Sequence, residues 1–341
     1  MSDPHGPARQ WRLWLVAIVV FAAAVRLIGL DYDDRHFFHP DERRIAYAVG
    51  EMSFQPLQLN PHFFSYGSFP IYIVRGVSSL LSNIHPGWGN YDGAMMTGRA
   101  VSGVAGTLTV LLLIVLGARL YNRQVGLLAG FLLGACVLHV QNSHFGVTDV
   151  FLTFMVTLAL YLLIGVVDRG WTRDYVYAGL VIGLAAATKF SALPLLAPLA
   201  IAGFTRMPTD GFWRVAGRGL LATGCVVLAF AVGQPYSFLD FAAYSRDIEE
   251  QSRMVRNAGL LPYTNQYVGV PKYLYDLREL VLWGMAPPLG LVAVWATATR
   301  VVGAERSRAT SCCSPGWCRS SSSPAPSRSS SSATCCRSTR S

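Results

Sequence analysis

The fold is decided by the stretch of sequence that follows the first apolar run, 13–30. It reads His39-Pro40-Asp41-Glu42-Arg43-Arg44-Ile45-Ala46-Tyr47-Ala48-Val49-Gly50-Glu51-Met52. Pro40 fits the first position of a helix, where its missing N–H costs nothing. Ile45, Val49 and Met52 then fall on one face of that helix. This pattern predicts an amphipathic helix that lies in the membrane interface rather than crossing the bilayer.

Asp41 and Glu42 begin this helix, where acidic side chains suit the helix dipole. Two adjacent carboxylates are also costly to hold beside hydrocarbon, so in membrane proteins they usually belong to a functional site. We expect Asp41 and Glu42 to be functional. The alternative is that they only stabilise the N-terminus of the helix.

The composition is that of a membrane protein. Of 341 residues, 52% are hydrophobic and only 14% are charged, with a mean hydropathy of +0.37, whereas soluble domains carry about 25% charged residues. We therefore predict an all-α polytopic membrane protein. The net charge of +9 comes from arginines scattered between apolar runs, so we expect no nucleic-acid partner.

Eight apolar stretches predict about eight membrane-spanning helices. They lie at about 13–30, 101–118, 125–140, 150–167, 175–187, 191–204, 215–233 and 280–299. The fifth and sixth are short, and we interpret them as two helices because the arginine-rich segments then share one side, which is the cytoplasmic one. The prediction places the N-terminus, 1–12, in the cytoplasm and leaves two long outer loops, 31–98 and 234–279. We interpret Phe69–Ile84, in the first of these loops, as a second interfacial helix.

The transmembrane domain is expected to span 13–300, and the character of the chain changes after it. The tail 301–341 is rich in serine, arginine and cysteine and has no helical or strand period. It is either a disordered cytoplasmic tail or the product of a shifted reading frame, which we favour; the natural protein would then continue with further spans. Its cysteines lack zinc-site spacing, and no other metal motif is present, so we expect no metal site.

Three further polar residues share the predicted outer face with Asp41 and Glu42: Arg99, Asp149 and Lys189. Arg99 and Lys189 taken singly are typical of interfacial anchors, but their shared face with the acids favours a site. Cationic side chains can neutralise a polyprenyl phosphate leaving group, and a carboxylate can deprotonate an acceptor hydroxyl. The chain has no glycine-rich phosphate loop, so a soluble nucleotide donor is not supported.

Pro40-Asp41-Glu42-Arg43-Arg44 and the later motifs resemble GT-C glycosyltransferases of the protein O-mannosyltransferase and aminoarabinose-transferase-like group. The later motifs are Asn60-Pro61-His62-Phe63-Phe64, Gly98-Arg99-Ala100, the His144–Asp149 loop and Thr188-Lys189. The resemblance implies an inverting hexosyl or mannosyl transferase that uses a polyprenyl-phosphate sugar. A hydroxyl of a protein, lipid or glycan would be the acceptor.

The resemblance also implies roles for individual residues. Asp41 would be the base on the acceptor, with Glu42 assisting or orienting it. The lipid phosphate would be bound by Arg44, Arg99 and Lys189, and the cavity or acceptor site would be lined by Asp149, His62, Tyr66 and His144. The chain departs from the group where Ser68-Phe69-Pro70 replaces a frequent Lys-Pro-Pro, and relatives have more spans.

Two alternatives remain open from the sequence. One is a lipid or solute transporter, towards which only Arg26 and Pro287-Pro288 point. The other is an inactive, truncated transferase. The acids at the predicted interface, rather than at mid-span, favour the enzyme.

Overall fold

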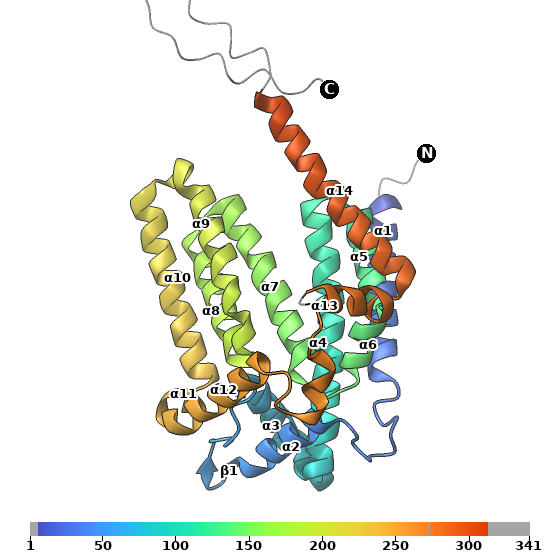
Figure 1. The fold of residues 1–341 in the computed structure, drawn as a ribbon, viewed down its shortest axis with the longest axis vertical. Helices are drawn as coiled ribbons and strands as arrows, with labels where there is room; N and C mark the ends of the chain where they lie inside the picture. Colours follow the sequence, from blue (N-terminus) through green and yellow to red (C-terminus); the bar gives the residue numbers. More distant parts are fainter. Residues whose placement is uncertain (1–5, 272, 313–341) are drawn as a thin grey trace, which may run out of the picture. The chain divides into compact units, whose positions relative to one another are not determined.

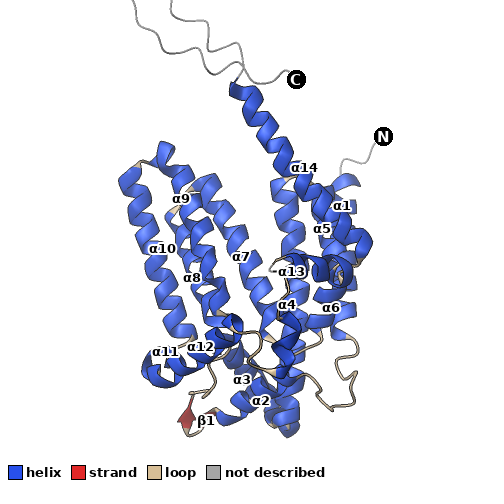
Figure 2. Ribbon diagram, in the orientation of Figure 1, coloured by secondary structure: helices blue, strands red, loops and turns tan. Residues whose placement is uncertain are grey.

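The computed structural model describes residues 6–271 and 273–312, and the described chain is almost entirely helical (Figure 2). It divides into two units, Met1–Pro287 and Pro288–Ser341. The long helices of the first unit are α1 (Gly6–Leu27), α4 (Tyr91–Leu120), α5 (Arg123–Gly134), α7 (Thr148–Arg169), α8 (Thr172–Thr188), α9 (Leu196–Asp210) and α10 (Phe212–Gly233). The second unit contains α14 (Pro287–Cys312). Residues 313–341 of the predicted low-complexity tail lie outside the described residues.

Five helical segments of the described chain are long and apolar enough to cross a membrane, and a bent pair raises this number to six. The five are α1, α4, α7, α10 and the segment Phe190–Asp210, in which the 3-10 turn η2 (Phe190–Leu195) leads into α9. This confirms the all-α polytopic fold. It is fewer than the eight spans predicted, partly because α8 has only 17 residues. The fifth and sixth apolar stretches do form separate helices, which meet at Lys189.

The bent pair consists of α5 and α6 (Val137–Ser143), whose axes differ by 61°. The third predicted stretch, 125–140, is therefore not one continuous helix. The buried guanidinium of Arg26 donates hydrogen bonds to the carbonyls of Leu133 and Gly134, each 3.1 Å away. The Leu133 carbonyl also accepts a hydrogen bond from the Cys136 N–H at 3.2 Å. Arg26 adds side-chain hydrogen bonds at this end of α5, where the last carbonyls lack intrahelical partners.

The last predicted stretch, 280–299, is also interrupted. A π-helical turn (Leu280–Gly284) ends before α14 begins at Pro287. Ala286, just before this proline, has a positive φ of 64°. The clash between a proline ring and the preceding residue disfavours helical backbone there, and Pro287 instead suits the first turn of a new helix. α14 then continues to Cys312, beyond the predicted start of the tail at 301.

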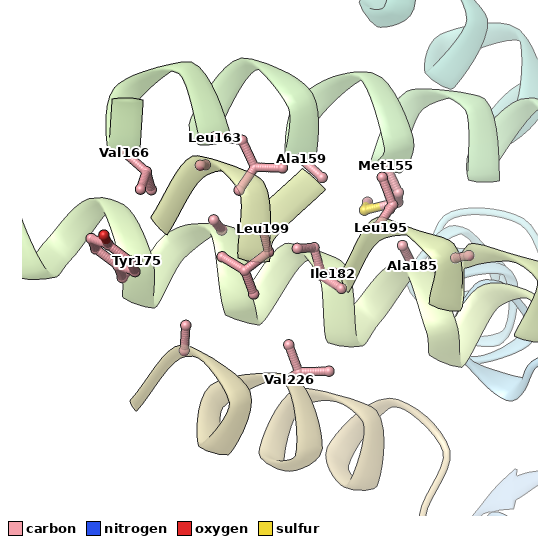
Figure 3. Close-up of a cluster of buried hydrophobic side chains, with 14 of the residues drawn as sticks. Met155, Ala159, Leu163, Val166, Tyr175, Ile182, Ala185, Leu195, Leu199 and Val226 are labelled. Carbon is pink, nitrogen blue, oxygen red and sulfur yellow. The ribbon is translucent and has the colours of Figure 1, made fainter. Parts of the chain in front are cut away.

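The main hydrophobic core lies between α7, α8, α9 and α10 (Figure 3). Met155 and Leu163 of α7 face Ile182 of α8 in this core. Gly179 and Gly183 bring α8 so close to α10 that a Cβ on either would lie within 2.5 Å of an α10 carbonyl oxygen. Small residues four apart are a common device for close packing of helices in membranes.

Shorter elements gather at one end of the first unit's helices (Figure 1). They are α2 (Pro40–Glu51), β1 (Ser53–Phe54), β2 (Leu57–Gln58), α3 (Ser68–Ser82), η1 (Pro86–Gly89), α11 (Tyr236–Leu239), α12 (Phe241–Arg256) and η3 (Pro262–Tyr267). The short helix α13 (Leu274–Glu279) lies nearer the middle of the long helices (Figure 1). α2 and α3 confirm the two short helices predicted in the first long loop. A second core holds them against α4, with Ile45, Val49 and Ile71 fully buried.

The other end of these helices carries the arginines that were predicted to share the cytoplasmic side. Arg119 pairs with Asp168 at 2.7 Å, and Arg169 pairs with Asp174 at 2.7 Å. A third carboxylate, Asp210, accepts hydrogen bonds from Arg206 at 2.8 Å and from Arg218 at 2.6 Å. The arginine-bearing helix ends thus lie opposite the short helices (Figure 1).

Candidate active site

The start of α2 sends its two carboxylates in different directions. The His39 ring accepts a hydrogen bond from the Asp41 N–H at 3.3 Å and so caps the helix. Successive residues of a helix are about 100° apart around its axis, as 3.6 residues make a turn. Glu42 consequently faces the core with 1% exposure, while Asp41 is half-buried.

Glu42 belongs to a buried ion-pair network. The guanidinium of Arg99, on α4, donates two hydrogen bonds to Glu42 at 2.9 and 3.0 Å. It donates two more to Asp33 at 3.0 and 2.8 Å, and one to the Leu30 carbonyl at 2.6 Å. These bonds hold the pKa of the Asp33 carboxyl below its usual range. One arginine thus ties α2 and the segment before it to α4.

The surroundings of Arg99 exclude solvent from its side chain completely. Its guanidinium lies between the rings of Tyr32 and Phe37, at 4.8 and 5.2 Å from their centroids, and the side chain has 0% exposure. All five N–H donors already point at oxygens. In this structure Arg99 has no N–H left over for a donor phosphate, and Glu42 is buried with 1% exposure. Both side chains hold α2 against α4.

The backbone at Gly146 completes this network. Its N–H donates a hydrogen bond to Glu42 at 2.5 Å. A Cβ at Gly146 would come within 3.2 Å of the Gly98 backbone, so a larger residue would push the 144–147 loop away from α4. The loop before α7 is thereby fixed to the same carboxylate that orients α2.

Asp41 opens onto a cavity of about 1170 Å³ between α2, the 59–67 segment, α12 and η3. The polar and aromatic residues lining it include His39, Asp41, Arg44, Tyr47, Glu51, His62, Tyr66, Asp247, Glu250, Gln251 and Tyr263. The volume is somewhat larger than the roughly 300–1,000 Å³ of ordinary ligand sites. Of the predicted residues, Asp41, Arg44, His62 and Tyr66 line this cavity.

Tyr66 links Asp41 to a second ion pair. Lys189 lies 2.7 Å from Asp149, and its ammonium group is 5.6 Å from the centroid of the Tyr66 ring. Burial raises the pKa of the Tyr66 phenol, and the nearby Asp41 and Asp149 carboxylates raise it further. Tyr66 therefore keeps its proton at neutral pH. Asp149 and Lys189 thus form an ion pair beside Tyr66, whereas Asp41 lines the cavity itself.

Gly67 allows this arrangement. Its N–H donates to the Thr188 carbonyl at 3.0 Å. A Cβ at Gly67 would lie 1.9 Å from the Ala187 carbonyl oxygen, so no other residue fits without moving the segment. The close approach brings Tyr66 beside Lys189 at the end of α8.

Two histidines take different places. His62 lines the cavity, and its Nε2 is 3.0 Å from the Gln58 amide nitrogen. His144, predicted to line the same cavity, instead directs its ring nitrogens at the Val140 and Ile28 carbonyls, at 3.0 and 3.2 Å. His144 is not among the residues that line the cavity, and its ring joins α6 to the end of α1.

Several site residues were missed by the sequence reasoning. Asp33 was not singled out, although it completes the Arg99 network. The acids of α12 were also missed: Asp247 accepts a hydrogen bond from the Phe64 N–H at 2.9 Å, and Asp240 accepts one from the Asn60 amide at 3.0 Å. These contacts join segments about 180 residues apart in the chain. Within the described residues, no group of three or more His, Cys, Asp or Glu could hold a metal ion.

Comparison with known proteins agrees with this architecture. Residues 92–235 match the family model described as dolichyl-phosphate-mannose-protein mannosyltransferase. The match includes Arg99, Asp149 and Lys189 and begins after the Asp41–Glu42 helix. No curated protein sequence matches the chain.

Three solved structures have a similar fold. The protein O-mannosyltransferase Pmt1-Pmt2 complex of S. cerevisiae, bound to the sugar donor, is 18% identical, with 69% of this chain and 34% of that chain covered and a TM-score of 0.52. ArnT from Cupriavidus metallidurans bound to undecaprenyl phosphate is 19% identical, with 84% and 51% covered and a TM-score of 0.54. The Archaeoglobus fulgidus oligosaccharyltransferase in complex with Zn and sulfate is 15% identical, with 86% and 43% covered and a TM-score of 0.50.

The chain spans 34% to 51% of the length of these three proteins. At such low identities the structural likeness establishes the fold. The family match covers residues 92–235 and so leaves out the Asp41–Glu42 motif. The resemblance to GT-C membrane glycosyltransferases of the protein O-mannosyltransferase and ArnT-like group is confirmed.

Proposed function

We propose that the chain acts in a glycosyltransferase that moves a sugar from a polyprenyl-phosphate-linked donor to an acceptor hydroxyl, with inversion at the anomeric carbon. The observation that carries this proposal is the placement of Asp41 in the wall of a cavity of about 1170 Å³. Arg44 lines the same cavity, and Lys189 lies beside Tyr66. Two of the similar structures hold a lipid phosphate or a sugar donor by their own description.

In the proposed reaction, Asp41 accepts the proton of the acceptor hydroxyl. The hydroxyl oxygen forms a bond to the anomeric carbon while the bond from that carbon to the phosphate oxygen breaks. Polyprenyl phosphate leaves with the electron pair, and the charges of Arg44 and Lys189 stabilise it. Tyr66, whose raised pKa keeps its proton, donates a hydrogen bond within the site.

We further propose that the site faces the outer side of the membrane. The cavity lies at the end of the helices opposite to the arginine pairs of Arg119, Arg169 and Arg206. Arginine-rich helix ends favour the cytoplasmic side. A hexosyl donor, of the mannosyl type, is the first to test, with a hydroxyl of a protein, lipid or glycan as acceptor.

The transporter alternative loses its main support. It relied on Arg26 as a charge in a substrate path, but this side chain is fully buried and caps the end of α5. A structural role for Arg26 favours the enzyme.

The test is sugar transfer in membranes from a panel of radiolabelled polyprenyl-phosphate sugars. Asp41→Asn is compared with Asp34→Asn, which alters an exposed acid outside the cavity. We expect Asp41→Asn to lose transfer and Asp34→Asn to keep it. Equal transfer by both variants would contradict the proposal, and transfer by neither variant nor the unaltered chain would identify an inactive form.

A further inference from the structure

A second cavity lies at the arginine-bearing end of the first unit, along α1 and α5. It encloses about 830 Å³, which is within the range of ordinary ligand sites. Most of its lining is apolar. The apolar residues deeper in the groove are Ala17, Ile18, Phe21, Leu127, Leu128 and Phe131.

The polar groups of this groove gather at one end. Gln10 comes near the start of α1, and Arg123 and Gln124 are the first residues of α5. The guanidinium of Arg123 lies over the ring of Trp11, at 5.4 Å from its centroid. The groove therefore has a polar mouth and an apolar body.

The length of the groove matches one leaflet of a bilayer. Its mouth is marked by Trp11 and its depth by Phe21, whose ring lies 6.1 Å from that of Phe131. Ten residues of helix separate Trp11 from Phe21, which corresponds to about 15 Å. The hydrocarbon core of a bilayer is about 30 Å thick, so each leaflet contributes about half of that.

The charge at the mouth is not neutralised by the protein. Nearby carboxylates at this end are already paired, Asp168 with Arg119 and Asp174 with Arg169. Among the described residues, Arg123 forms no ion pair. Arg123 is exposed, so an apolar occupant would leave it in contact with water alone, whereas an anionic headgroup would supply a charged partner.

We propose that the groove is a binding site for an anionic phospholipid. One acyl chain lies along the apolar wall between α1 and α5. The phosphate and its anionic headgroup lie at the mouth, within reach of Arg123, Gln10 and Gln124. The site is separate from the Asp41 cavity, and the inference does not depend on the proposed transfer reaction.

The test is native mass spectrometry of the purified full chain in detergent, with equal amounts of phosphatidylglycerol and phosphatidylcholine that carry the same acyl chains. We expect phosphatidylglycerol to be retained in preference to phosphatidylcholine. Arg123→Gln should reduce that preference about fivefold, the effect of one cation near an anionic surface. Arg173→Gln is the matched control, because Arg173 also lies over a tryptophan, Trp171 at 4.1 Å, but outside the groove.

A second pair of variants tests the groove itself and remains informative if Arg123→Gln does not fold. Ala17→Phe fills the groove and should abolish retention of both lipids. Val20→Phe adds the same ring at a position 60% exposed and outside the groove, and should change nothing. Equal losses in Arg123→Gln and Arg173→Gln, or full retention in Ala17→Phe, would overturn the proposal in favour of general surface lipid. A double-mass species that disappears in Ala17→Phe would overturn it in favour of a second copy of the chain.

Discussion

The two faces of α2 place adjacent carboxylates in opposite environments, one buried and one open to a cavity. On the inner face, Glu42 shares Arg99 with Asp33 in a network that water does not reach. On the other face, Asp41 lines an open cavity together with Arg44. A helix separates neighbouring side chains by about 100°, so one residue step divides a positioning group from a group that can meet substrate.

The inner face should be the most sensitive to substitution. Arg99→Ala leaves Glu42 and Asp33 as buried charges without a cation, which is expected to cost about 3–5 kcal/mol in free energy of unfolding. Thermal unfolding in detergent, followed by circular dichroism, measures the loss. Arg43→Ala removes an exposed arginine of the same helix and should leave the unfolding temperature unchanged. Similar unfolding temperatures for the two variants would show that the buried network does not hold α2.

Gly67, which packs against the end of α8, should tolerate little change. Gly67→Ala would place a methyl group 1.9 Å from the Ala187 carbonyl oxygen, with an expected cost of about 1–3 kcal/mol. It would also move Tyr66 away from Lys189 and so reduce transfer. Gly76→Ala is the control, since this α3 glycine has open space around it. Alanine there should stabilise the helix by about 0.5–1 kcal/mol. A destabilised Gly76→Ala would show that the loss in Gly67→Ala is not specific to the contact with Ala187.

The cavity face should lose function rather than stability. Arg44→Ala and Lys189→Ala are expected to raise the KM for the donor, because each removes a cation proposed to contact the phosphate. The unfolding free energy should change by less than about 1 kcal/mol, as exposed ion pairs contribute little. Donor titrations of both variants give the KM. An unaltered KM would show that both residues are interfacial anchors and do not contact the donor phosphate.

The smallest expected effect concerns pH. Hydrogen bonds from Arg99 lower the pKa of Asp33 in the folded chain, so this carboxylate adds stability above its unfolded pKa of about 3.9. The added stability is lost as the pH falls through the lower, folded pKa. The difference in unfolding temperature between the unaltered chain and Asp33→Asn should stay constant from pH 7 to 5 and shrink in stronger acid. A difference that grows in acid would contradict the ion pairing of Asp33.

Part of the site could be predicted from local patterns. The Pro-Asp-Glu start and the spacing of Ile45 and Val49 predicted α2 correctly. The same spacing already held a signal for Glu42, which lies three residues before Ile45 and seven before Val49 and so shares their buried face. The resemblance left open whether Glu42 assists or orients the base, and this periodicity favours an orienting role.

Other features could not be read from the sequence because they depend on contacts between distant segments. Asp33 and Arg99 are 66 residues apart, and Asn60 reaches Asp240 across 180 residues. The breaks after Gly134 and before Pro287 also shortened two predicted spans. Pro287 was a visible signal for the second break, whereas the first depends on Arg26 reaching across from α1.

The central claim is that Asp41 acts in transfer while Glu42 positions the helix. Asp41→Asn and Glu42→Gln, measured side by side for transfer rate and unfolding temperature, test it most directly. Asp41→Asn is predicted to lose about 10²–10⁴-fold in transfer rate at an unchanged unfolding temperature, while Glu42→Gln lowers the unfolding temperature. Full transfer by Asp41→Asn, or a Glu42→Gln chain of native stability without transfer, would contradict the account.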